Sequence, residues 1–149
     1  MKKLLLLLLL CFAFSACERR AVPDPFSADF SCEVSFERGG TAYTLEYAKV
    51  GGRETATVVA PATLAGLVAV REDGEITLAH ADITFTALAA DGLFAFAACL
   101  EPKELSYLAD GCYGADGYKL YTDSAGIPTR VCTESFDLRI LRFEGGITR

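Results

Sequence analysis

The sequence has few of the residues that most often carry enzyme chemistry. It contains one histidine, His80, and no Gly-x-Ser-x-Gly stretch. A serine nucleophile with a histidine base is therefore not predicted, since Asp82 lies too close in a tight turn for its side chain to meet that of His80. The cysteines include no Cys-x-x-Cys pair, the spacing typical of zinc sites. We expect no enzyme activity, no cofactor and no metal site.

The chain also lacks an apolar run long enough to cross a bilayer as a helix. Its longest run, Leu4 to Phe14, falls well short of the roughly 20 residues that a transmembrane helix needs. Lys2 and Lys3 precede the run, and small residues followed by charge end it, an order typical of a secretory signal. Residues 1–16 are therefore predicted to form the helix of a signal peptide.

The end of that segment, Phe14-Ser15-Ala16-Cys17, resembles the lipobox of bacterial lipoproteins. The resemblance implies that Cys17 is joined to diacylglycerol by a thioether, becomes the new N-terminus and carries acyl chains such as palmitate. The alternative is ordinary signal-peptidase cleavage after Ala13-Phe14-Ser15, which would leave Cys17 as a free thiol. We expect lipidation of Cys17 and a protein held by this lipid to the extracytoplasmic face of the cell membrane.

Positive charge is scarce in the predicted mature protein. Removal of residues 1–16 takes away Lys2 and Lys3 but no acid, so 12 basic residues face 20 acidic ones, a net charge near −8. The basic residues are also scattered along the chain. This balance argues against nucleic acid as a partner, because binding to phosphates depends on clustered positive charge.

The mature chain is long enough for one hydrophobic core but not for two. Residues 17–26 contain Pro23 and Pro25 and are predicted to form a short, stiff tether. Residues 27–149 are then a single β-rich domain.

A strict alternation of apolar and polar residues begins at Asp29. From Asp29 to Glu37 the apolar side chains occupy every even position, which predicts a half-buried strand. Gly39-Gly40 offers a two-residue turn, and the alternation continues beyond it at Tyr43, Leu45 and Tyr47. This pattern predicts a β-hairpin.

Turn signals and short alternating segments recur along the rest of the chain, with Gly51-Gly52 and Asp73-Gly74 as further two-residue turns. This spacing predicts an antiparallel meander. Further strands are predicted at residues 55–60, 67–70, 75–79, 83–86, 118–121, 128–133 and 136–143.

The alternation is lost between residues 87 and 110, where Ala and Leu are frequent. One or two short helices are predicted there, the second beginning at Pro102, a residue suited to the first turn of a helix. Residues 111–117 are predicted to form a glycine-rich loop. The apolar stripe expected to cover the sheet consists of Leu93, Phe94, Phe96, Ala97 and Leu100.

Four segments of the sequence resemble segments of small extracytoplasmic bacterial lipoproteins with a LolA-like (lipoprotein-carrier-like) half-barrel, a resemblance that covers about residues 27–143. The segments are FSADFSCEVSF, APATLAGLVAV, DGEITLAHADITF and DSAGIPTRV. The resemblance implies an antiparallel sheet curved into an incomplete (half) β-barrel around a hydrophobic cavity that helices plug. It also implies carriage of lipids or lipoproteins, as in the best-known members of the family.

Two functions follow from this layout. In the first, a membrane-anchored lipoprotein binds a lipid or another apolar small molecule on the inner face of the half-barrel. In the second, a structural or protein-interaction lipoprotein has a filled core, no small ligand and an envelope protein as its partner. The residues expected to face an apolar ligand are Phe30, Val34, Phe36, Tyr43, Leu45, Tyr47 and Phe85.

Four cysteines remain for the domain, and in an exported protein they invite disulfide bonds. Cys32 lies on the predicted buried face and Cys132 on the opposite face, so a bond between these two is not expected. Cys99 and Cys112 flank the predicted second helix and are the candidate disulfide. The alternative is that all four are reduced and serve as small apolar residues.

Overall fold

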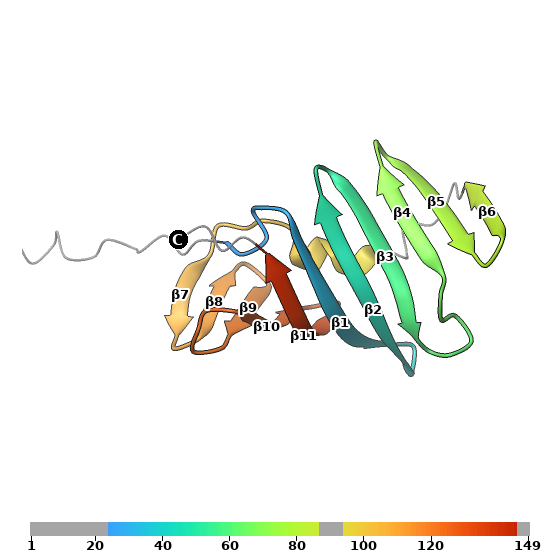
Figure 1. Ribbon diagram of the computed structural model, residues 1–149. Helices are drawn as coiled ribbons and strands as arrows, with labels where there is room; N and C mark the ends of the chain where they lie inside the picture. The colour runs from blue at the N-terminus through green and yellow to red at the C-terminus, as the bar shows by residue number, and fades with distance from the viewer. Residues whose placement is uncertain (1–23, 87–93, 146–149) are drawn as a thin grey trace, which may run out of the picture.

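The computed structural model describes residues 24–86 and 94–145. Their strands form one antiparallel, eleven-stranded sheet (Figure 1). The strands are β1 (Phe30–Arg38), β2 (Thr41–Val50), β3 (Arg53–Ala60), β4 (Val68–Glu72), β5 (Glu75–His80), β6 (Ile83–Thr86), β7 (Ser106–Ala109), β8 (Cys112–Ala115), β9 (Tyr118–Thr122), β10 (Pro128–Thr133) and β11 (Asp137–Gly145). The predicted signal peptide, Cys17 and the first part of the tether lie outside the described residues.

The sheet consists of two meanders joined in the middle. Its strand order is β6-β5-β4-β3-β2-β1-β11-β10-β9-β8-β7, so β6 and β7 are its edges. The first and last strands of the domain pair with each other, with Phe30 opposite Gly145 and Ser35 opposite Arg139. The first and last described strands therefore meet at the centre of the sheet, and the predicted mainly β, incompletely closed fold is confirmed.

Four β-bulges accompany the curvature of the sheet. Irregular register leaves one extra residue at each of Val59, Leu108, Thr129 and Leu141. A bulge bends and twists its strand and turns the extra side chain out of the regular alternation. This explains why Val59, Leu108 and Leu141 are exposed, at 46%, 53% and 57%, although they are apolar residues of strands.

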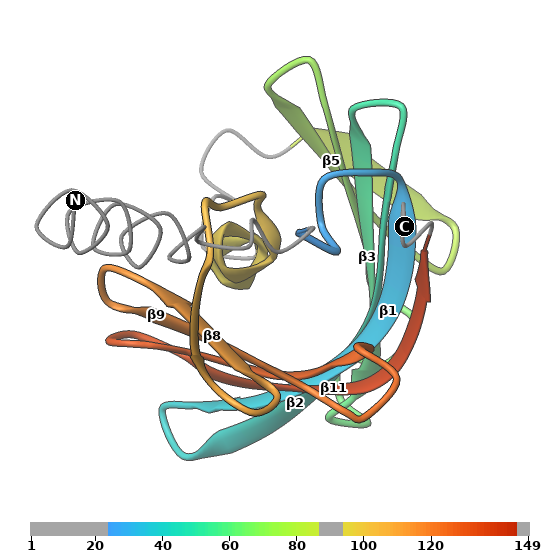
Figure 2. The same ribbon diagram turned by 90° about the vertical axis from the view of Figure 1, so that its left-hand side faces the viewer.

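In the described part of the chain, the curved sheet wraps around a short helix. The 3-10 helix η2 (Ala95–Leu100) lies in the hollow of the sheet (Figure 2). Phe96, Ala97, Cys99 and Leu100 are buried, whereas Ala98 is exposed. Among the described residues, no helix has the length and apolar character needed to cross a membrane.

Of the one or two short helices predicted, the second does not form, because the chain makes the hairpin β7–β8 in its place. Pro102 lies in an extended segment just after η2, and Asp110-Gly111 forms a two-residue turn between Ala109 and Cys112, which pair. Gly111 has a φ of 65°, a conformation that costs glycine little. The predicted glycine-rich loop, residues 111–117, is therefore strand β8 with a turn on either side of it.

Candidate functional site

The concave face of the sheet is where the sequence predicts an apolar ligand. Four of the predicted ligand-facing residues are 5% exposed or less: Phe30, Val34, Leu45 and Tyr47. Phe36 is partly buried against them, and Tyr43 stacks on Phe36 with 5.6 Å between ring centroids. The side chain of Phe85 lies outside the part of the chain that the structure describes. The structure thus brings the other six together on β1 and β2.

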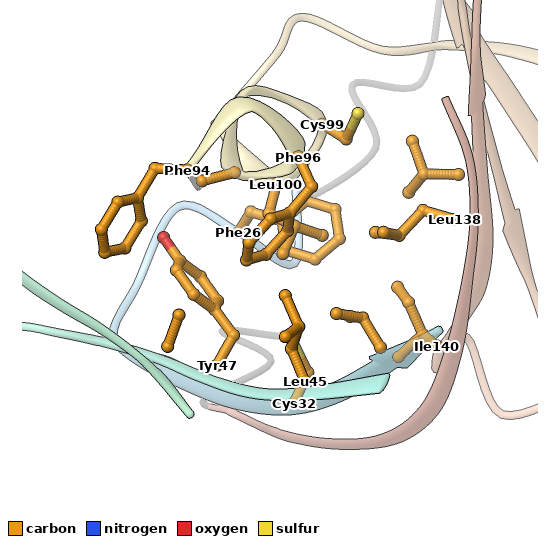
Figure 3. Close-up of a cluster of buried hydrophobic side chains, with 14 of the residues drawn as sticks. Phe26, Cys32, Leu45, Tyr47, Phe94, Phe96, Cys99, Leu100, Leu138 and Ile140 are labelled. Carbon is orange, nitrogen blue, oxygen red and sulfur yellow. The ribbon is translucent and has the colours of Figure 1, made fainter. Parts of the chain in front are cut away.

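Side chains from outside the strands fill the space in front of this face. Phe26, Phe94, Phe96 and Leu100 are each 2% exposed or less, and Figure 3 shows them between η2 and the strands. Phe96 stacks on Phe36 at a centroid distance of 5.6 Å. The described concave face is therefore occupied by the protein's own aromatic and aliphatic groups.

One polar cluster lies at the margin of the concave face, where β3 and β4 pair. Nη2 of Arg71 donates a hydrogen bond of 2.6 Å to Oε2 of Glu54, and both side chains are largely shielded, with 29% and 13% exposed. The guanidinium of Arg71 also lies 4.9 Å from the centroid of the Phe94 ring. Burial, with a further contribution from Glu54, raises the pKa of the Tyr47 hydroxyl.

This cluster is satisfied internally. No buried side-chain nitrogen or oxygen of the described residues lacks a hydrogen-bond partner. In the described core, every buried residue other than glycine and proline is hydrophobic. A ligand site usually presents a few polar groups that await a partner. The arrangement around Glu54 and Arg71 instead ties β3 and β4 to the residue that precedes η2.

Phe26 is a core residue, although the sequence predicts it to be the end of the tether. Its ring centroid lies 5.3 Å from that of Phe30 and 5.9 Å from that of Phe143. Asp24 holds the turn before it, because its carboxylate accepts hydrogen bonds from the backbone N–H groups of Phe26 and Lys103. The pair Asp24 and Phe26, two residues apart beside Pro25, is a turn signal that could have been recognised in the sequence.

The four described cysteines are free thiols. Cys32 is buried on the concave side and Cys132 lies on the outer face beside Asp137, which confirms that they are on opposite faces. The candidate bond between Cys99 and Cys112 is absent. Its two cysteines lie on different elements, since Cys99 is on η2 in the core whereas Cys112 begins β8, next to the edge strand β7.

Cys32, Cys99 and Cys132 are poorly suited to nucleophilic chemistry. Burial raises the pKa of Cys32 to about 12 and also raises the pKa of Cys99. For Cys132, burial and then the charge of Asp137 raise the pKa. The raised pKa values keep these three thiols protonated at neutral pH, whereas the thiolate is the reactive form. Cys32 and Cys99 therefore pack as small apolar groups, and Cys132 donates a hydrogen bond to Asp137.

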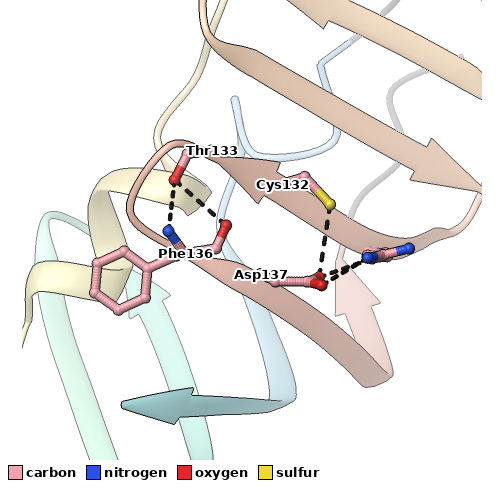
Figure 4. Close-up of polar contacts among 5 residues, drawn as sticks. Cys132, Thr133, Phe136 and Asp137 are labelled. Atoms are coloured by element: carbon pink, nitrogen blue, oxygen red, sulfur yellow. Dashed lines mark hydrogen bonds and ion pairs between the residues drawn. The ribbon is translucent and has the colours of Figure 1, made fainter. Parts of the chain in front are cut away.

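Polar contacts gather at the β10–β11 hairpin (Figure 4). Nε and Nη2 of Arg130 donate to the two carboxylate oxygens of Asp137, at 2.7 and 2.6 Å, and this pairing lowers the pKa of Asp137. The Thr133 hydroxyl oxygen accepts a hydrogen bond of 3.0 Å from the N–H of Phe136. These contacts close the hairpin and pair adjacent strands, which is a structural role.

Groups for metal or acid–base chemistry do not converge in the described part of the chain. Residues 24–86 and 94–145 contain no group of three or more His, Cys, Asp or Glu side chains that could hold a metal ion. His80 is exposed at the end of β5, with Nε2 3.3 Å from the carbonyl oxygen of Ala65. Its contact is therefore with the backbone of a neighbouring turn.

Comparison with known proteins gives a likeness in fold. No protein-family model matches the chain, and no curated protein matches it. The crystal structure of an uncharacterized conserved protein from Thermus thermophilus is similar, with a TM-score of 0.50 and 15% sequence identity over 90% of this chain and 87% of that one. At this identity the likeness shows the fold alone, and membership of the LolA-like family stays a prediction.

Proposed function

We propose that this protein is a membrane-anchored bacterial lipoprotein whose β-domain is a structural or protein-interaction module of the cell envelope. The observation that supports this function best is the filled concave face, where Phe26, Phe94, Phe96 and Leu100 pack against the sheet. Small curved sheets are commonly filled by side chains in this way. In this proposal the domain acts through its outer surface and performs no catalysis.

Carriage of an apolar ligand has less support. An acyl chain on the concave face would have to displace the rings of Phe94 and Phe96, which are 2% and 1% exposed. Burial of one phenylalanine side chain contributes about 1.5–3 kcal/mol. A ligand would need to supply at least the free energy that both rings lose on moving into water.

The proposed anchor is a lipid on Cys17, supported by the signal-like segment and the lipobox-like residues before it. Asp24 follows Cys17 after a short stretch, and an extended chain of that length reaches at most about 25 Å. The domain would therefore stay close to the extracytoplasmic face of the cell membrane.

Labelling with radioactive palmitate in a bacterial host tests the anchor. The wild-type protein is expected to incorporate label, and Cys17→Ser to incorporate none. Cys11→Ser is the matched control, because Cys11 lies within the predicted signal, and it should be labelled like the wild type. Equal labelling of the wild type and Cys17→Ser would contradict the anchor.

A further inference from the structure

A groove of about 590 Å³ crosses the outer face of the last four-stranded part of the sheet. Its floor is one transverse row of the sheet: Ser106 on β7 lies opposite Gly114 on β8, Gly114 opposite Lys119 on β9, and Lys119 opposite Cys132 on β10. Three of these four residues are small, which explains why the surface is hollow there. The groove opens at β7, an edge of the sheet.

One wall of the groove is apolar. Leu108, the bulged residue of β7, is 53% exposed, and its side chain lies across β8. A Cβ atom at Gly114 would be only 2.6 Å from Cδ1 of Leu108. The absence of a side chain at Gly114 therefore allows Leu108 to form this wall.

The other wall carries negative charge. Asp116 and Glu134, in the turns after β8 and β10, line the groove and are exposed. Neither carboxylate forms a salt bridge with a described residue, in contrast to Glu46, Glu54, Glu72, Asp137 and Glu144. Lys119 is the basic residue of the lining, so the acids exceed it by one charge.

We infer that this groove binds an extended, basic segment of a partner polypeptide. The row of four strands is about 14 Å across, which an extended chain spans with about four residues. An apolar side chain of the partner rests on Leu108, and an Arg or Lys side chain reaches Asp116 and Glu134, whose charge it complements. The inference rests on the proposed protein-interaction function and names the chemistry of the partner.

Fluorescence anisotropy tests the inference with the full-length protein in uncharged detergent. The probe is a fluorescein-labelled hexapeptide of alternating valine and arginine, and its counterpart has glutamate in place of arginine. We expect the arginine peptide to bind and the glutamate peptide not to bind. The double variant Asp116→Asn/Glu134→Gln should weaken binding about fivefold to tenfold. Ser106→Tyr, which fills the groove at the sheet edge, should weaken it as well.

The matched control is Glu75→Gln/Asp82→Asn, which removes the same charge from exposed positions in the other half of the sheet. This variant should bind the arginine peptide like the wild type. Equal weakening by both double variants would reduce the interaction to net charge and overturn the inference, as would tighter binding of the glutamate peptide or no binding of either. These results do not depend on a lipid at Cys17, so they leave the palmitate test of the anchor unaffected.

Discussion

The ring of Tyr47 on β2 meets the ring of Phe96 on η2 edge to face, with 5.4 Å between centroids and 80° between planes. Such a pair is favourable beyond the area it buries. Tyr47 is one of the residues predicted to face a ligand, and Phe96 occupies the space where that ligand would lie. The contact therefore explains why the described concave face is filled.

Truncation of Phe96 should destabilise the domain strongly. Phe96 is 1% exposed, and Phe96→Ala is expected to lower the free energy of unfolding by about 3–5 kcal/mol, because a buried aromatic ring is lost and a cavity remains. Urea unfolding followed by circular dichroism measures this change. Ile83→Ala is the control, since Ile83 is 68% exposed, and should change it by about 0.5 kcal/mol or less. A loss below about 1 kcal/mol for Phe96→Ala would contradict a filled core.

Two ion pairs between β3 and β4 should differ in strength. Arg71 and Glu54 meet at 2.6 Å with 29% and 13% of their side chains exposed, whereas Arg53 and Glu72 meet at 3.9 Å with 56% and 59% exposed. A double-mutant cycle on the shielded pair is expected to give a coupling of about 1–2 kcal/mol, and one on the exposed pair about 0–0.5 kcal/mol. Equal coupling energies for the two pairs would contradict the expectation that shielding of Arg71 by Phe94 strengthens its ion pair with Glu54.

Two glycines with the same backbone conformation should differ in their tolerance of alanine. Gly111 and Gly117 both have a φ of 65°. A Cβ at Gly111 would lie 2.8 Å from the backbone oxygen of Thr122, whereas a Cβ at Gly117 meets open space. Gly117→Ala is expected to cost about 1 kcal/mol from backbone strain, and Gly111→Ala at least about 1 kcal/mol more. Thermal unfolding compares the two variants, and equal costs would contradict the geometry of the β7–β8 turn.

Alkaline pH should destabilise the domain partly through Cys32. Burial raises the pKa of Cys32 from 9.0 to about 12, so from about pH 9 the unfolded chain releases this proton first. The stabilisation that comes from this protonated thiol is fully present below pH 9. It is lost as the pH rises toward 12, by up to about 1.4 kcal/mol per pH unit. Urea unfolding between pH 8 and 11 should show a shallower decline for Cys32→Ala than for the wild type. Identical slopes would argue against a buried, protonated thiol.

The first strand shows what the sequence alone could predict. The alternation around Phe30, Cys32 and Val34 predicts a strand with one buried face, and β1 has that burial pattern. The edge hairpin β7–β8 could not be predicted in this way. β7 is exposed at all four positions, so it has no alternation, although Asp110-Gly111 is the same dipeptide as the correctly predicted turn Asp73-Gly74.

The state of the concave face could not be predicted from the sequence. Alternation places Leu45 and Tyr47 on an inner face, but it does not say whether a ligand or another segment lies opposite. That depends on contacts between residues far apart in the chain, such as Tyr47 with Phe96 and Phe26 with Phe143. The bulges at Val59, Leu108 and Leu141, which turn apolar side chains outward, likewise depend on pairing between strands.

Native mass spectrometry of the protein purified from its own host tests the central claim, a lipoprotein with a filled core, most directly. The expected mass is that of the polypeptide from Cys17 onward plus its covalent lipid, with nothing released on collisional activation. The Cys17→Ser variant should show the mass of a polypeptide that carries no lipid. A lipid that Cys17→Ser retains and releases without breaking a covalent bond would contradict the filled core and favour a carrier.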